Sequence, residues 1–270
     1  MKLDETSKLT TGSVHLDGTG LMSLEGVFFP GRTVTVILDH NKLTNIAGVP
    51  AEIVGAFSCE YNALRSLKGG PKHVTSYFSV AFNLNLRSLE GGPEKVGSSY
   101  YCQQTAIKSF KGIAKEIGLS VYASGCKLTS LEGLDVKFLE DFDVSYNSLT
   151  DLVSAPTQDV RELDASNNKL ESLKGAPAHV RKLFLERNST LTSLHGIGTQ
   201  FIKSAETIKL TGCPIESHAL GLVLVHDLDE LRGDFPGIEI LKKYIGQGEN
   251  ALIDCQHALI EAGYEDLAQL

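Results

Sequence analysis

The chain has 270 residues, a formal net charge of −8 at pH 7 and an apolar content of 42%, which suits one soluble solenoid or at most two domains. The acidic balance argues against a nucleic-acid partner, because nucleic-acid binding needs a basic footprint. No stretch approaches ~18 uncharged apolar residues and the N-terminus has no apolar core, so we expect neither a membrane span nor a secretory signal, and a cytoplasmic location.

After a short lead-in over residues 1–12, the sequence repeats itself every 21 or 22 residues, as from Leu149 to Leu170 and from Leu64 to Leu86. Nine copies and a partial tenth fill residues 13–215. They begin at Leu21, Leu43, Leu64, Leu86, Ile107, Leu128, Leu149, Leu170, Leu191 and Ile208. A fixed period in this range indicates a solenoid of stacked units, which offers a long surface in place of a closed pocket.

Within each copy, a short alternating run such as Phe142-x-Val144 predicts a strand with one buried face. An apolar residue three positions after the starting leucine faces the core as well. Two positions later comes a glycine in every full copy except one, where Ser154 stands. A glycine that recurs at a turn indicates positive φ or close backbone approach. Prolines two residues further on favour an extended or 3₁₀ segment on the convex side.

A polar position lies inside each repeat, three residues after the second apolar strand position. Asparagine fills it at Asn41, Asn62, Asn83, Asn147, Asn168 and Asn188, and Thr19, Thr105, Cys126 and Cys213 fill it elsewhere. A buried amide must be hydrogen-bonded, so we expect these side chains to bond the backbones of neighbouring turns, with threonine or cysteine as partial substitutes. One extra residue after Asn83 and Asn188 predicts a small bulge at each place.

The resulting pattern, Leu-x-Leu-x-x-Asn-x-Leu-x-x-Leu, resembles the leucine-rich repeat family. The short period is similar to the repeats of bacterial effectors and phage-encoded proteins, and the closing segment ALIDCQHALIEAGYEDLAQL resembles the tail of uncharacterised phage leucine-rich-repeat proteins. The resemblance implies an α/β repeat solenoid: a horseshoe with short parallel strands on its concave face, an irregular or 3₁₀ convex face and a small C-terminal helical cap.

The period stops after Ile215, and residues 216–270 carry apolar residues at helical spacing between glycine and proline breakers. A solenoid end exposes the core of its last repeat and needs a cap. This segment is therefore interpreted as a helical cap, with a separate docking module as the alternative.

No catalytic, metal or cofactor motif is present in the sequence: there is no G-x-x-x-x-G-K, H-E-x-x-H, G-x-S-x-G or C-x-x-C. Four of the five cysteines occupy buried columns of the repeat and the fifth lies in a helical pattern, so we interpret them as small apolar residues. We therefore expect a protein that is not an enzyme and that has no cofactor.

Recognition is expected on the outward positions of the strands. The candidate partner-binding residues are aromatic or acidic: Tyr77, Phe82, Tyr101, Tyr122, Tyr146, Asp141, Asp143, Glu162, Asp164 and Phe184. Exposed aromatic residues are frequent in interface hot spots, although tyrosines can also merely pack on each other. Four carboxylates on two strands repel each other unless a basic group arrives, although they can also form a solvated acidic face. Paired carboxylates also occur in glycoside hydrolases, but an open sheet does not suit that chemistry.

Our leading hypothesis is a non-enzymatic module that binds a protein partner, with a basic patch, through the concave sheet face. The phage-like tail suggests a modulator or inhibitor of a host protein in the host cytoplasm. The alternative is a structural or assembly protein, either a virion component or a homo-oligomer that associates with itself.

Overall fold

The structure is a computed structural model that describes residues 11–270. The predicted lead-in over residues 1–12 therefore lies outside the described residues, except for Thr11 and Gly12 at the start of the first strand. The described chain divides into two compact units. The first comprises residues 11–127 together with 132–136, and the second comprises 128–131 and 137–270.

Two parallel sheets form the first unit. The main sheet contains, in order, β1 (Thr11–His15), β2 (Arg32–Ile37), β4 (Phe57–Ser58), β6 (Phe78–Ser79), β8 (Tyr100–Tyr101) and β10 (Val121–Tyr122). The second contains β3 (Glu52–Ile53), β5 (His73–Val74), β7 (Lys95–Val96) and β9 (Glu116–Ile117). Each strand pairs with the strand one turn later, as the sequence period predicts.

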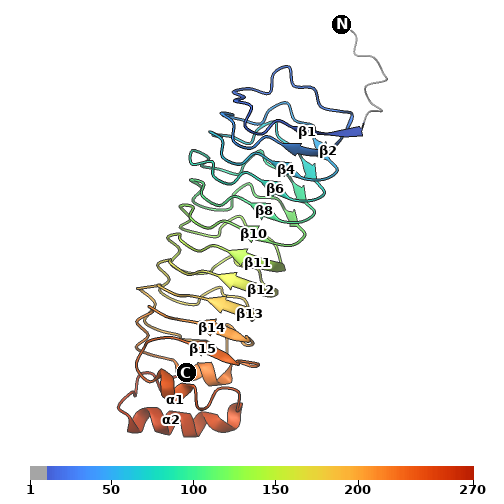
Figure 1. Cartoon of the computed structure of the whole chain (residues 1–270). Coiled ribbons are helices and arrows are strands. Elements are labelled where there is room, and N and C mark those ends of the chain that lie inside the picture. The colour runs from blue at the N-terminus through green and yellow to red at the C-terminus, as the bar shows by residue number, and fades with distance from the viewer. Residues whose placement is uncertain (1–10) are drawn as a thin grey trace. The chain divides into compact units, whose positions relative to one another are not determined.

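One parallel sheet dominates the second unit, with β11 (Leu139–Asp143), β12 (Asp159–Asp164), β13 (His179–Phe184), β14 (Thr207–Lys209) and β15 (Glu230–Arg232) in order. β15 pairs with β14 from Thr207↔Glu230 to Lys209↔Arg232, so the sheet extends past Ile215, where the repeat pattern ends. Two 3₁₀ helices, η2 (Leu220–Leu224) and η3 (Glu249–Ala251), and two α-helices, α1 (Ile238–Leu241) and α2 (Leu252–Glu261), lie in the C-terminal part of this unit (Figure 1).

Both units are parallel β-solenoids with few helices. Within residues 11–270, the α-helical residues are confined to α1 and α2, and no repeat contributes an α-helix to pack on the sheet. The expected α/β class is therefore wrong. In the first unit, the segments that lead to Pro50, Pro71 and Pro93 contain only turns and irregular structure, as expected, and the two-residue strands of the second sheet begin two residues after these prolines.

A difference of one residue distinguishes the turns that contain β3 to β10 from the turns of the second unit. Val74 and Phe78, both buried, are four positions apart, whereas the equivalent Val180 and Leu183 are three apart. In the turns that contain β3 to β10 the additional residue interrupts the extended segment, and each of these turns has two short strands. In the second unit the segment is continuous and gives the longer strands β12 and β13.

The predicted apolar columns form the core. Leu43, Leu64, Leu86 and their equivalents in the later copies have essentially no exposed area, whereas Leu21 of the first copy is half-buried. Each buried leucine contributes roughly 1.5–3 kcal/mol. The aromatic rings of Phe57, Phe78 and Tyr100 pack on one another inside, with centroids 5.1 Å apart in both pairs. Tyr100 is fully buried and its hydroxyl has no hydrogen-bond partner among the described residues.

The asparagine column bonds the turns to one another, as predicted. The Asn83 side chain accepts the Leu64 N–H at 2.9 Å and donates to the Cys59 carbonyl, one turn earlier, at 2.9 Å. Where cysteine replaces asparagine, the donor role is kept: the Cys126 thiol donates to the Cys102 carbonyl and the Cys213 thiol to the Leu185 carbonyl. Cysteine and threonine are thus partial substitutes, as expected.

The turn predictions are confirmed as well. The glycines of the repeat column have positive φ, from 79° at Gly69 to 103° at Gly48, and Ser154, the exception, has φ of 74°. The two extra residues are accommodated by tight turns, in which the Leu86 N–H donates to Asn83 and the Leu191 N–H donates to Asn188.

The C-terminal helices pack against the last turns of the second unit. Cys255 and Leu259 of α2 are buried. The chain after α2 returns to η2, where His218 and Leu220 donate their N–H groups to the carbonyls of Asp266 and Leu267 at 2.9 Å. None of the helices in residues 11–270 combines the length and apolar character needed to cross a membrane.

Candidate binding surface

In three successive turns of the first unit, an aromatic side chain occupies the position just before the asparagine of the repeat. His40 stacks on Tyr61 with centroids 4.5 Å apart and planes inclined by 7°, and Tyr61 stacks on Phe82 at 4.2 Å and 5°. We call these three residues the rim stack. All three have left-handed backbones, with φ of 54°, 51° and 58°, a costly conformation for bulky side chains. Phe82 was a candidate from the sequence, and it belongs to this row.

A second row, formed by Tyr77, Tyr101 and Tyr122, lies on the main sheet. Tyr101 and Tyr122 are neighbours in register on β8 and β10, and their rings stack at 4.9 Å with an inclination of 5°. Tyr77 meets Tyr101 edge to face, with centroids 5.9 Å apart and planes at 89°. We call this the tyrosine row. The structure therefore brings three of the predicted aromatic residues together, each half-buried.

Carboxylates lie beside the tyrosine row. Asp39 accepts the Ser58 hydroxyl at 2.7 Å, and Glu60 accepts the Ser79 hydroxyl at 2.5 Å. Desolvation raises the pKa of Tyr77, and the negative charges of Asp39 and Glu60 raise it further. Ser58 and Ser79 have outward positions in the strand alternation, yet both are buried. Alternation therefore fixes which way a side chain points without making it accessible.

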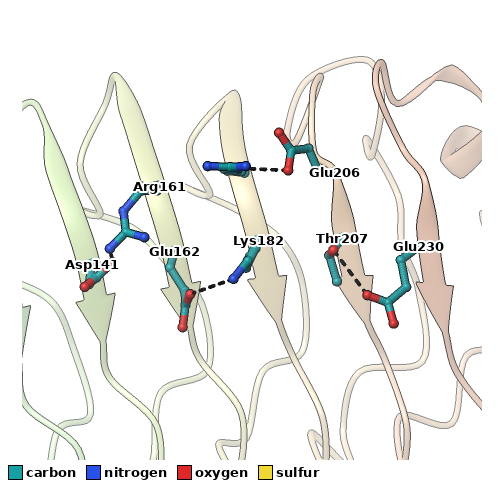
Figure 2. Close-up of polar contacts among 8 residues, drawn as sticks. Asp141, Arg161, Glu162, Lys182, Glu206, Thr207 and Glu230 are labelled. Carbon is teal, nitrogen blue, oxygen red and sulfur yellow. Dashed lines mark hydrogen bonds and ion pairs between the residues drawn. The ribbon is translucent and has the colours of Figure 1, made fainter.

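In the second unit, two of the four predicted carboxylates already have basic partners. Asp141 pairs with Arg161 at 2.5 Å, and Glu162 pairs with Lys182 of the next strand at 3.6 Å. Figure 2 shows both pairs on neighbouring strands, with further contacts at Glu206 and between Thr207 and Glu230. Asp141 and Glu162 therefore already have a basic group of the chain beside them, which neither of the two interpretations of the acidic set included.

Asp143 and Asp164 form the other half of the acidic set. They face each other in register on β11 and β12. Asp143 accepts the N–H and hydroxyl of Ser145 at 3.0 and 2.7 Å, and Asp164 accepts the Ser166 N–H at 2.9 Å. Desolvation raises the pKa of Asp164, and nearby Asp143 and Glu186 add to the effect. Both carboxylates accept bonds from backbone N–H groups, and neither has an ion-pair partner within residues 11–270.

The other two candidates in this unit lie beside cations. The Lys209 ammonium group sits over the Phe184 ring, 4.4 Å from its centroid, at a distance typical of a cation–π contact. Tyr146 is 60% exposed and has a left-handed backbone with φ of 54°. It lines a polar hollow with Arg187, Lys209 and Arg232. The outward face of this unit is therefore mixed in charge.

Arg161 and Lys182 are the residues that the sequence reasoning missed. Glu162 and Lys182 occupy the same column of successive repeats, as Asp141 and Glu162 do. Opposite charges in one column on adjacent strands favour cross-strand pairing. Reading that column from repeat to repeat would have predicted the Glu162–Lys182 pair.

The cysteines show no sign of reactive thiolates. All five are buried and free. Burial raises the pKa of Cys213 to about 11 and that of Cys255 to about 11, which opposes formation of the nucleophilic thiolate. Among residues 11–270, no group of three or more His, Cys, Asp and Glu side chains is arranged to hold a metal ion.

Comparison with protein-family models, with curated proteins and with solved structures gives no significant match to this chain. The candidate surface therefore rests on its own geometry.

Proposed function

We propose that this protein is a non-enzymatic module that binds a protein partner through the outward face of its main sheet. The rim stack carries the proposal. Three consecutive turns hold an aromatic side chain in the left-handed region, where glycine or asparagine would cost less, and Tyr61 is 44% exposed. Strained backbone that persists through successive turns is typical of functional surfaces, and aromatic residues are enriched in hot spots.

The ring geometry determines what kind of contact the surface offers. Within the rim stack and the Tyr101–Tyr122 pair, neighbouring rings cover each other's faces. Their edges and the tyrosine hydroxyls are the parts left for a partner. Aromatic edges carry partial positive charge and suit carbonyl oxygens or the faces of other rings. This favours a polypeptide over a sugar, which needs an open ring face.

Asp143 and Asp164 support a partner with a basic patch. Their adjacent carboxylates repel each other on the sheet, and a Lys or Arg side chain between them would relieve that repulsion. The overall charge of −8 favours the same kind of partner. A nucleic-acid partner would face the opposite electrostatics.

The assignment to the leucine-rich repeat family is also a proposal. It is supported by the Leu-x-Leu-x-x-Asn-x-Leu-x-x-Leu pattern and by the inter-turn bonds of the asparagines. A horseshoe curvature, a phage origin and a role as modulator of a host protein in the host cytoplasm follow from that resemblance and have no other support.

A double variant, Tyr101→Ala with Tyr122→Ala, tests the binding surface. Affinity purification from the native host is expected to recover a partner with the wild-type chain and to lose it with the variant, because the exposed ring edges are gone. Phe28→Ala is the control, since Phe28 is 62% exposed and belongs to neither ring row. Recovery of the same partner, undiminished, by the double variant would refute the assignment of this surface.

Self-assembly is the competing proposal. Ile253 and Ile260, seven residues apart on α2, are 62% and 44% exposed, so one face of the helix presents apolar side chains. Light scattering from dilute to concentrated solutions distinguishes the two proposals. A monodisperse monomer throughout contradicts self-assembly, and a mass that rises with concentration and returns to the monomer in Ile253→Glu supports it.

A further inference from the structure

An apolar hollow lies at the C-terminal end of the second unit, and neither row of aromatic rings contributes to its lining. It has a volume of about 650 Å³, within the range of small-molecule sites, which are roughly 300–1,000 Å³. Its floor consists of side chains that are almost fully buried: Cys213, Ile215, Phe235 and Leu267.

Four chain segments build this hollow. Ser189 follows β13, Gly212 to Glu216 follow β14, Asp234 to Pro236 follow β15, and Gly263 to Leu267 follow α2. The last two segments enter beside the turn after β14 because the chain beyond α2 bonds back to His218 and Leu220. The walls are formed by Pro214, Pro236 and Tyr264, which are rigid side chains that lose little entropy on binding a ligand.

The rim of the hollow is acidic. Glu216, Asp234, Glu265 and Asp266 line it, and no Lys, Arg or His does. In the described part of the chain none of these four has an ion-pair partner. Asp234 accepts the Gly212 N–H at 2.8 Å and Asp266 accepts the Gln269 amide at 3.1 Å, so these two are partly held by the protein. Glu216 and Glu265 are both exposed.

We propose that this hollow, which we call the C-terminal pocket, binds a small organic cation with an apolar body and one ammonium group. The apolar body would displace water from Ile215, Phe235 and Leu267, and the charge would remain at the rim beside Glu216 and Glu265. An anion of the same shape would meet four carboxylates without a compensating cation. Ligands that share the same apolar body gain the same stabilisation from its burial, so the pocket distinguishes between them by the sign of their charge.

Three probes of nearly equal size and different charge test this selection: phenethylammonium, 2-phenylethanol and phenylacetate. Binding is followed by NMR through the methyl signals of Ile215 and Leu267 of the full chain. Ligands of so few atoms bind with a Kd on the order of 1 mM. The expected order of affinity is ammonium, then alcohol, then carboxylate. Equal affinity of the three probes would overturn the proposal, as would unchanged methyl signals at ~10 mM ammonium.

Matched variants show whether the rim provides the selectivity. Glu216→Gln with Glu265→Gln is expected to weaken phenethylammonium binding about three- to tenfold and to leave 2-phenylethanol unchanged. The control, Glu171→Gln with Glu261→Gln, removes the same charge from exposed positions outside the pocket and is expected to change neither. Equal weakening by both double variants would mean that net charge, and not the pocket, attracts the cation, and the proposal would fail.

Discussion

Removal of one asparagine from the ladder is expected to be among the most destabilising single changes in the solenoid. Asn83 has no exposed area and its amide joins two turns: it accepts the Leu64 N–H at 2.9 Å and donates to the Cys59 carbonyl at 2.9 Å. Both of those residues are also fully buried. In Asn83→Ala, the N–H and the carbonyl lose their partner and no water can reach them.

The magnitude follows from these two groups. Each unsatisfied buried group costs about 1–3 kcal/mol, so we expect Asn83→Ala to lower the free energy of unfolding by about 4 kcal/mol. For a unit of this size, that corresponds to a decrease in Tm on the order of 10 °C. Asn83→Thr should lie between, because a threonine hydroxyl can keep one bond to the backbone, as the Thr105 hydroxyl does to the Cys102 carbonyl of its own turn, and is expected to leave the Leu64 N–H without its partner.

Urea unfolding followed by far-UV circular dichroism measures the effect, with the midpoint and the slope both compared between variants. Asn85→Ala is the matched control, because Asn85 is an exposed turn residue two positions away and should change stability by less than about 0.5 kcal/mol. If Asn83→Ala and Asn85→Ala unfold within about 1 kcal/mol of each other, the asparagine ladder does not stabilise the stacking of turns.

Three further predictions concern stability. Tyr100→Phe removes a buried hydroxyl that has no described partner. It is expected to raise the free energy of unfolding by about 1 kcal/mol and therefore to raise the urea midpoint; a lower midpoint would show that the hydroxyl is hydrogen-bonded in the folded protein. Gly112→Ala places a Cβ 2.4 Å from the Glu90 nitrogen, whereas Gly26→Ala, at nearly the same φ, meets nothing. Gly112→Ala should therefore lower the free energy of unfolding, measured by thermal unfolding, by at least about 2 kcal/mol more than Gly26→Ala does. Equal decreases in the two variants would contradict close stacking of the turns. Asp164→Asn should stabilise the protein at pH 7, because burial raises the pKa of this carboxyl in the folded state. The protonated wild-type carboxyl contributes stability at low pH, and this contribution is lost as pH rises through the pKa of the folded state. The difference in free energy of unfolding between the variant and the wild type must therefore disappear on acidification. A difference that does not change with pH would show that the raised pKa is not its cause.

The scaffold could be predicted from the sequence because it recurs with every turn. A position that is apolar in each copy is expected to be buried, and a glycine that follows it by two residues in every full copy except one is expected to permit a special backbone. Residues that depart from the repeat pattern keep the same structural role. Ser154 has the same left-handed backbone as the glycines that it replaces, and Cys126 makes one of the inter-turn bonds that an asparagine makes. Stacking therefore imposes the conformation, whichever residue is present.

The second sheet could not be predicted in the same way. Its strands contain two residues each, and two residues show no alternation. What distinguishes the first unit is the single additional residue between Val74 and Phe78, which Val180 and Leu183 lack. Aligning the copies on their leucines does not reveal this difference, because the repeat length already varies between 21 and 22 residues.

The candidate surface was predicted in part. Strand alternation correctly placed Tyr101 beside Tyr122, and it listed Tyr77 and Phe82 as outward residues. It could not separate Phe82, which stacks on Tyr61, from the tyrosine row. The C-terminal pocket left no signal, since its walls come from segments that share no period.

The stacked rings bear on two interpretations that the sequence left open. Tyrosines that only pack on each other need no special backbone, because side chains on adjacent strands meet at ordinary β conformations, as Tyr101 and Tyr122 do on β8 and β10. His40, Tyr61 and Phe82 stack from left-handed positions, where asparagine occurs at Asn167 in the second unit at lower cost. The fold itself imposes this backbone, because Gln104 and Arg187 have φ of 55° and 58° at the same position. What the proposed recognition by ring edges would explain is therefore the choice of aromatic residues in three successive turns, and not the backbone conformation.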